Sequence, residues 1–340
     1  MRKYYIIIFL LIFTKILYSS WRPYDFYKCG AKGLGTGGAF TGIADDVSAV
    51  YWNPAGLVQI SKPTLFYNMD AQIRIVQIID TTLKLTYKFP ALLGFVYPLR
   101  HNSTVGFSID TPFQRKIPYK FYVYELSLLY SFPVMRHLYV GIKPSINYGT
   151  YGSYSGATGW GWSYQIGILY FMSPKLHFGF NYHSKINIKW DNYGEYITLK
   201  ETFPDFFTTG VAYQITRKVI MDLDIEYQHW KAISFVADNN DIAPTDNIET
   251  GLFKNIHPHL GFMFLEERSG AHLRTGLLTD YYIHDDGTGD TQLLWSIGVG
   301  AYAFKIIKFE ISLMDSFLMR LINSKNNRIE TIQIAAEYRF

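Results

Sequence analysis

The stretch Gly30–Leu57 reads GAKGLGTGGAFTGIADDVSAVYWNPAGL, and the rest of the chain is organised around it. It holds six glycines up to Gly42, and Pro54 ends whatever comes before, so no regular helix or strand is expected here. Its apolar residues are nevertheless too many for a solvated linker: Ala39, Phe40, Ile43, Ala44, Val47, Val50 and Trp52. We therefore predict a compact, irregular segment buried inside a larger structure.

One motif within this stretch has to be excluded first. Gly33, Gly35 and Gly38 match the spacing G-x-G-x-x-G, which binds dinucleotides when it follows a strand and opens a helix in a βαβ unit. The residues before it are polar and aromatic, and no alternation of strands and helices follows. The glycines are better explained by tight turns of the backbone against a wall.

The residues before the stretch have the pattern of an export signal. Arg2 and Lys3 precede the apolar run Tyr4–Phe13, and Leu17 and Ser19 give a small-residue cleavage pattern, so residues 1–20 are predicted to be a signal peptide. Their removal takes away three of the 32 basic residues and none of the 28 acidic ones, which lowers the net charge from +4 to +1. Such a charge argues against a nucleic-acid partner. The single cysteine, Cys29, excludes an internal disulfide framework.

Alternation of apolar and polar residues predicts the fold class. In Ile220–Gln228 the odd positions are apolar and the even ones acidic or polar, and the same period of two recurs in Lys175–His183 and at the C-terminus. The chain has 28 Tyr, 25 Phe and 7 Trp but only 18% charged residues, as a lipid-facing surface requires. No stretch after the signal reaches the roughly 18 apolar residues of a spanning helix. These features predict an all-β protein, a transmembrane antiparallel β-barrel.

The alternating runs amount to about fourteen strands, an even number as in single-chain outer-membrane barrels. They are expected at Pro63–Arg74, Ala91–Leu99, Thr104–Pro112, Phe121–Phe132, His137–Tyr148, Trp160–Met172, Lys175–Ile188, Phe203–Ile215, Val219–Lys231, Ile256–Leu265, Ala271–Tyr282, Gln292–Phe304, Ile307–Phe317 and Ile329–Phe340. A further strand within Ile75–Phe89 is left open. Short and long connections alternate, which predicts periplasmic turns and extracellular loops. Residues 21–61 then form a hatch, or plug, and residues 62–340 the barrel.

Three motifs resemble a known family. Gly33–Phe40, Ile43–Asp46 and Tyr51–Gly56 are similar to the N-terminal signature of FadL/TodX proteins, outer-membrane transporters of long-chain fatty acids and other hydrophobic molecules. The resemblance continues through Trp160–Ile186, with His183 where arginine is usual, and through Pro204–Trp230. The glycine-rich half also resembles PorV-type proteins of secretion systems. The resemblance implies that the following residues form a hatch that plugs the barrel and gates it: Gly33, Gly35, Gly38, Trp52, Asn53, Pro54, Ala55 and Gly56.

The resemblance implies passive transport of a hydrophobic molecule such as a long-chain fatty acid across the outer membrane of a diderm bacterium. No cofactor, metal or catalytic group is expected, and no nucleophile motif indicates an enzyme. The expected partners are the cargo, outer-membrane lipid and the barrel assembly machinery. The alternative is a PorV-like carrier or assembly protein, which would hold a partner protein at the cell surface.

Several polar residues are candidates for the lumen. Asp222, Asp224 and Glu226 share one strand face that points inward, where Arg274, Lys308 and Arg339 are expected to balance them. His257 and His259 also share a face, and a lumen-facing pair is favoured over a metal site because no carboxylate or cysteine is near in sequence. Asp285–Asp290 lacks the distal glutamate of a calcium loop and is interpreted as a solvated turn.

The last residues have the pattern of a barrel's closing strand. Phe340 ends an alternating run, and Tyr338 falls where an aromatic girdle meets the membrane interface. These two residues are predicted to serve as the C-terminal signal for assembly into the outer membrane.

Overall fold

The structure is a computed structural model of the 340-residue chain. It describes residues 25–26, 28–76, 82–115, 121–151, 156–191, 199–229, 232, 234–237, 240–241, 255–266, 270–283, 289–303, 306–316 and 328–340. The predicted signal peptide and the predicted turn Asp285–Asp290, apart from its last two residues, lie outside this part of the chain.

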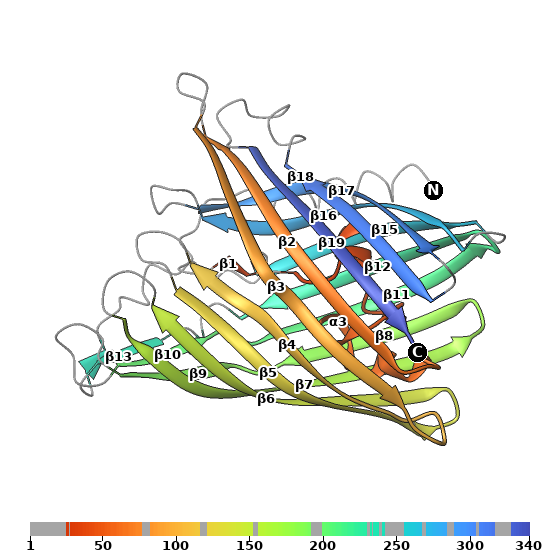
Figure 1. Ribbon diagram of the computed structural model, residues 1–340, viewed down its shortest axis with the longest axis horizontal. Helices are drawn as coiled ribbons and strands as arrows, with labels where there is room; N and C mark the ends of the chain where they lie inside the picture. The colour runs from red at the N-terminus through yellow and green to blue at the C-terminus, as the bar shows by residue number, and fades with distance from the viewer. Residues whose placement is uncertain are drawn as a thin grey trace, which may run out of the picture.

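The chain forms a closed antiparallel β-barrel of 14 strands (Figure 1), as predicted. Three barrel strands are each made of two elements in succession, β8 with β9, β10 with β11, and β12 with β13. The barrel elements are β2 Thr64–Val76, β3 Thr82–Pro98, β4 Thr104–Arg115, β5 Phe121–Met135, β6 Leu138–Tyr151, β7 Thr158–Ser173, β8 Leu176–His183, β9 Ile186–Asp191, β10 Leu199–Phe203, β11 Phe206–Thr216, β12 Val219–Gln228, β13 Ser234–Ala237, β15 Ile256–Leu265, β16 His272–Ile283, β17 Gly289–Ala303, β18 Ile307–Asp315 and β19 Arg328–Arg339. The ladder between β19 and β2 closes the barrel.

The alternation seen in the sequence separates two faces of the wall. On β7 every second side chain is exposed, from Trp160 and Trp162 at one end to Met172 at the other. Large apolar side chains are exposed in the same way on β5, β6, β8, β11 and β18, because this outer face is in contact with lipid. Most of the alternate residues are buried on the inner face. The barrel is therefore a multi-pass outer-membrane protein.

The strand boundaries differ from the prediction mainly near β3. This strand begins at Thr82, not at Ala91 as predicted, and so includes much of Ile75–Phe89, where a further strand was left open. Leu83, Leu85 and Tyr87 alternate with polar residues, and pairing with β2 extends the hairpin to Val76 and Thr82. Between the predicted strands Lys175–Ile188 and Phe203–Ile215, the last residues of β9 likewise pair with β10.

The ladder between β3 and β4 is incomplete. It ends at Leu92 and Asp110, and beyond that point β4 pairs with β5 and with the two-residue strand β1, Asp25–Phe26. Within the described residues, the remaining part of β3 pairs only with β2.

The N-terminal segment, residues 28–60, lies inside the barrel (Figure 1). It contains the short helices α2, Ala31–Gly35, and α3, Ala49–Trp52, followed by the 3₁₀ helix η1, Pro54–Gln59. The expectation that no regular element would form here was wrong, because single helical turns fit between the glycines. Among the described residues, no helix is both long enough and apolar enough to cross a membrane.

Candidate functional site

The N-terminal segment is enclosed almost completely. From Lys28 to Leu57, every residue except Asp45 is buried. Helix α2 contacts β16, β17, β18 and β19, whereas η1 contacts β5, β6 and β7, so the segment touches the wall on opposite sides. It therefore reaches across the lumen from one side of the wall to the other.

Glycines of the wall make this close approach possible. A Cβ atom added to Gly141 would lie 2.3 Å from the Ala55 amide nitrogen, and one added to Gly276 would lie 2.4 Å from that of Gly37. Both distances are too short for real atoms, so the backbone of the segment rests directly on the backbone of the strands. Opposing pairs in the ladders share this role. We call the set the glycine belt: Gly141, Gly167, Gly179, Gly210, Gly261, Gly276 and Gly298.

Asn53 joins two parts of the segment to the wall. Its side-chain Nδ2 donates to the carbonyl of Thr41 at 2.9 Å and to that of Ile168 on β7 at 3.0 Å. Its Oδ1 accepts from the Ala55 amide at 3.1 Å, which caps η1 with Pro54 as first residue. The Pro54 carbonyl in turn accepts from the Ser131 hydroxyl at 2.6 Å. The Asn-Pro-Ala motif therefore caps η1 and also attaches the segment to the wall.

Trp52 packs against other residues of the segment. Its ring meets Phe40 edge-on at 6.3 Å and Tyr51 at 5.0 Å, both within the segment. It also covers Gly33, where an added Cβ would lie 2.4 Å from Trp52 Nε1. Trp52 therefore holds the two halves of the segment together. The other glycines of the motif make close contacts as well, Gly35 with β17, Gly38 with His259 and Gly56 with Ala44.

The three acidic residues of β12 point inward, and Asp224 and Glu226 hold the segment. The Asp224 Oδ2 accepts from the amides of Phe40 and Thr41 at 3.0 and 2.9 Å. Glu226 forms a buried ion pair with Lys28 at 2.8 Å. Asp222 lies on the same face beside Gly42. The cations expected to balance this row were wrongly assigned, because the partner of Glu226 comes from the segment itself.

Arg274, Lys308 and Arg339 have other partners. Arg274 and Lys308 both pair with Glu310, which also accepts from His272 at 3.3 Å, and Arg339 pairs with Glu337 at 2.6 Å. Strands β16, β18 and β19, on one side of the barrel, supply these groups. The wall therefore neutralises its own charges on this side, and the row on β12 is left to bind the segment.

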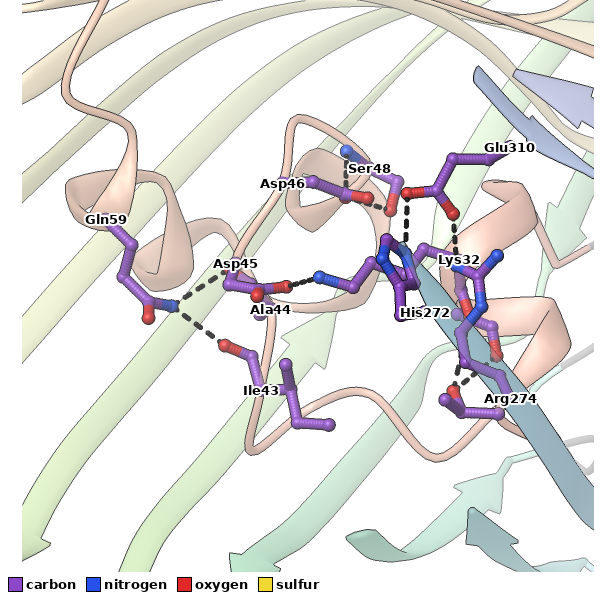
Figure 2. A network of polar contacts seen from close by, with 12 residues as sticks. Lys32, Ile43, Ala44, Asp45, Asp46, Ser48, Gln59, His272, Arg274 and Glu310 are labelled. Carbon is purple, nitrogen blue, oxygen red and sulfur yellow. Dashed lines mark hydrogen bonds and ion pairs between the residues drawn. The ribbon is translucent and has the colours of Figure 1, made fainter. Parts of the chain in front are cut away.

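A polar network lies between the segment and this side of the wall (Figure 2). Lys32 donates to Asp45 at 2.5 Å, and this lysine is the main cause that lowers the pKa of the Asp45 carboxyl, against the opposing effect of burial. Asp46 accepts from the amide and hydroxyl of Ser48, at 2.9 and 2.5 Å. Burial raises the pKa of Asp46 to about 6, with Lys32 and Lys308 opposing the shift.

A second polar cluster lies on the inner wall next to the segment. Lys143 pairs with Asp110 at 2.9 Å and with Glu125 at 3.3 Å, and Glu125 also contacts His183 Nε2 at 3.1 Å. Four strands, β4, β5, β6 and β8, contribute one residue each. All four side chains are buried, so their charges are balanced inside the barrel.

An apolar cluster lies beyond this polar one, toward the long loops. The inner face of β5 shows this order along the strand. Phe121 and Val123 come first, Glu125 of the polar cluster follows, and Ser131 contacts the segment last. Phe203 packs on Phe113 at 5.0 Å and on Phe121 at 5.9 Å. We call this set the aromatic cluster: Phe113, Phe121, Tyr151, Trp190, Phe203 and Phe206. Trp190 donates to Glu201 at 2.7 Å, so the polar atom of its ring is satisfied.

On β9 the usual pattern of an outer-membrane strand is inverted. Ile186, Ile188 and Trp190 face inward, whereas Asn187 and Lys189 face outward. Barrel interiors are generally polar and their outer faces apolar. The inner wall near the long loops is therefore shaped for an apolar occupant.

The remaining candidates have structural contacts. His257 and His259 are both buried on the inner face of β15, and His259 Nδ1 lies 3.0 Å from the Gly38 carbonyl oxygen. Within the described part of the chain, no group of three or more potential ligands converges on a metal position. At the C-terminus, the Phe340 amide donates to Pro63 at 3.0 Å and its ring meets Tyr338 at 4.7 Å and Phe95 at 6.3 Å.

Sequence reasoning missed the aromatic cluster and the polar cluster of Lys143. Their members are on different strands, and only the register of the barrel brings them together. The inverted alternation on β9 was the one signal in the sequence, since Ile186-Asn187-Ile188-Lys189-Trp190 alternates as a strand whose apolar side faces the lumen.

Solved structures share this fold. A Pseudomonas aeruginosa FadL homologue has a TM-score of 0.67 and 12% identity, covering 95% of this chain and 100% of that one. The CymD monoaromatic hydrocarbon channel has a TM-score of 0.64 and 14% identity, covering 93% and 99%. The Ralstonia pickettii toluene transporter TbuX has a TM-score of 0.62 and 13% identity, with the same coverage. No family model and no curated protein sequence matches the chain.

These similarities define the class of protein. The chain has the fold of FadL- and TodX-type channels, and it covers nearly the full length of each of those three structures. It is an outer-membrane β-barrel of the kind that includes channels for hydrophobic compounds.

Proposed function

We propose that this protein is a passive outer-membrane channel for hydrophobic small molecules, which enter from the side of the long loops. The observation that carries the proposal is the aromatic cluster on the inner wall. A water-filled channel would have a polar wall here. The side chains of the cluster are buried against one another, so an apolar cargo would enter among them, and it gains about 25 cal/mol per Å² of apolar area that leaves water. The solved structures with this fold include transporters whose cargo is toluene, and this function calls for no catalytic group.

The charges of the lumen favour an uncharged cargo over a fatty acid. Among the residues whose side-chain burial the structure describes, five Lys or Arg side chains are buried, and each is paired with a carboxylate: Lys28, Lys32, Lys143, Arg274 and Lys308. A carboxylate head group would have to break one of these pairs to be neutralised, because a buried charge needs a partner. We therefore propose aromatic or other neutral hydrocarbons, rather than the long-chain fatty acids expected from sequence, as the cargo.

Release would pass the N-terminal segment where it is least enclosed. A cavity of about 120 Å³ lies between the segment and the wall, lined by Ile43, Asp45 and Gln59 on one side and by Lys175 and His177 on the other. Asp45 is the only residue of 28–57 that is not buried. We propose that the turn Ile43–Asp45 moves to let cargo reach the periplasm, while the parts resting on the glycine belt stay in place.

Uptake by cells that contain or lack the protein tests this function. Labelled toluene should enter faster with the protein, whereas labelled oleate should enter at the same rate in both strains. Phe203→Asn, which places an amide in the aromatic cluster, should slow toluene entry, and Thr202→Asn on the outward face is the matched control. If the protein increased the uptake of neither compound, the channel function would be refuted. If it increased the uptake of oleate alone, the proposed cargo would be refuted.

A further inference from the structure

Two lysines lie directly opposite each other on the outer face of the barrel. Lys189 of β9 and Lys200 of β10 are partners in the antiparallel ladder, and both side chains are exposed. Like charges in this position repel, and they destabilise a sheet unless something of opposite charge lies between them. Within the described residues neither lysine has an ion pair, and Asp191, two residues beyond Lys189 on the same face, has none either.

The surroundings of the pair place it at the level of lipid head groups. Trp160 of β7 is the ladder partner of Lys189 on its other side, and Trp162 is the partner of Asn187. Trp160 and Trp162 are 61% and 76% exposed, and tryptophans with this exposure on a barrel mark the membrane interface. The outward face of β10 continues with Thr202, whose hydroxyl donates to Asn187 at 2.9 Å. Polar groups thus replace the apolar band at this height.

The pair belongs to the outer side of the membrane. The short turns at residues 136–137, 174–175 and 217–218 join the opposite ends of the strands, and short turns of such barrels face the periplasm. Elements β9, β10 and β13 lie side by side at the other end (Figure 1). A ligand of this patch therefore comes from the outer leaflet.

We propose that Lys189 and Lys200 bind a phosphate group of a glycolipid in the outer leaflet, with Trp160 packed against its sugar or acyl portion. A phosphate satisfies two ammonium groups at once, since it offers several acceptor oxygens and a charge between −1 and −2. The apolar neighbours on β7 leave room for acyl chains beside it. The ligand is bound from the membrane side of the wall, away from the lumen, and the site does not depend on transport.

Binding to the purified, folded barrel in detergent tests this site by native mass spectrometry. The probe is bisphosphorylated lipid A, compared with the same lipid after removal of its phosphates. The double variant Lys189→Gln with Lys200→Gln should bind the phosphorylated probe about 30-fold more weakly, from roughly fivefold for each lysine near a charged membrane surface. The control is Lys62→Gln with Lys218→Gln, two exposed lysines at the short-turn end, which should bind like the wild type.

Retained heat-modifiability shows that each variant is folded. Equal affinity of the double variant and the wild type would overturn the proposal, as would equal binding of the dephosphorylated probe. Phosphatidylglycerol serves as the other source of phosphate. If it bound through the same lysines as tightly as lipid A, the ligand would be a phospholipid and the assignment to a glycolipid would be wrong.

Discussion

Replacing Asn53 with alanine should release part of the N-terminal segment without unfolding the barrel. The change removes three hydrogen bonds, to Thr41, Ile168 and Ala55. At about 1 kcal/mol net for each bond, docking of the segment weakens by about 3 kcal/mol. Since 1.4 kcal/mol corresponds to a factor of ten, the undocked fraction should rise about 100-fold.

Hydrogen exchange of the folded barrel measures this fraction. Amides of peptides that cover residues 39–57 should exchange about 100-fold faster in Asn53→Ala, while those of β5 to β7 stay protected. The control is Asn187→Ala, an exposed asparagine that accepts one bond from Thr202. Exchange in the segment within threefold of the wild type would show that the glycine belt alone holds it, and that the cap described for Asn53 contributes little.

Further outcomes are expected from other parts of the segment and wall. Because the pKa of Asp46 is raised to about 6 in the folded protein, docking should be tighter at pH 5 than at pH 7 by about 1.3 kcal/mol, and Asp46→Asn should abolish this difference in exchange of the Ser48 amide. Gly276→Ala should displace the segment, since the new Cβ would lie 2.4 Å from Gly37, and single-channel recordings should show higher conductance than Gly94→Ala, where the nearest atom is 3.1 Å away. Deleting Phe340 should reduce the amount of assembled barrel in the outer membrane, and unchanged amounts would exclude it as an assembly signal. Trp52→Ala should cost about 3–5 kcal/mol of segment stability, seen as faster proteolysis of residues 28–60 in the intact barrel.

The wall of the barrel could be predicted from sequence because each strand has a local signal. The alternation in Ile220–Gln228 identified which side chains of β12 face the lumen, without knowledge of any neighbour. The prediction of strand boundaries was wrong at Thr82. The length of the hairpin of β2 and β3 depends on pairing between the two strands, and not on the run of residues alone.

Less of the candidate site than of the wall could be predicted from sequence. Burial of Gly30–Leu57 could be predicted from its apolar content, yet the partner of Glu226 could not, since Lys28 lies 198 residues away and only closure of the barrel brings it near. The neighbours of Trp52 could not be predicted for a related reason. Its neighbours Gly33 and Phe40 are close in the chain, and the turn between them, which sequence could not specify, folds them back onto the indole.

The glycine belt bears on how such a barrel is assembled. A wall of ordinary side chains would leave a gap into which a plug could slide after closure, whereas strands without side chains at Gly179, Gly261 and Gly276 lie directly against the segment's backbone. The strands would then close around an N-terminal segment that is already in place, and the segment would determine the shape of the lumen. A chain synthesised without residues 28–60 would have lost its template, and adding those residues later as a separate peptide should not restore the native lumen.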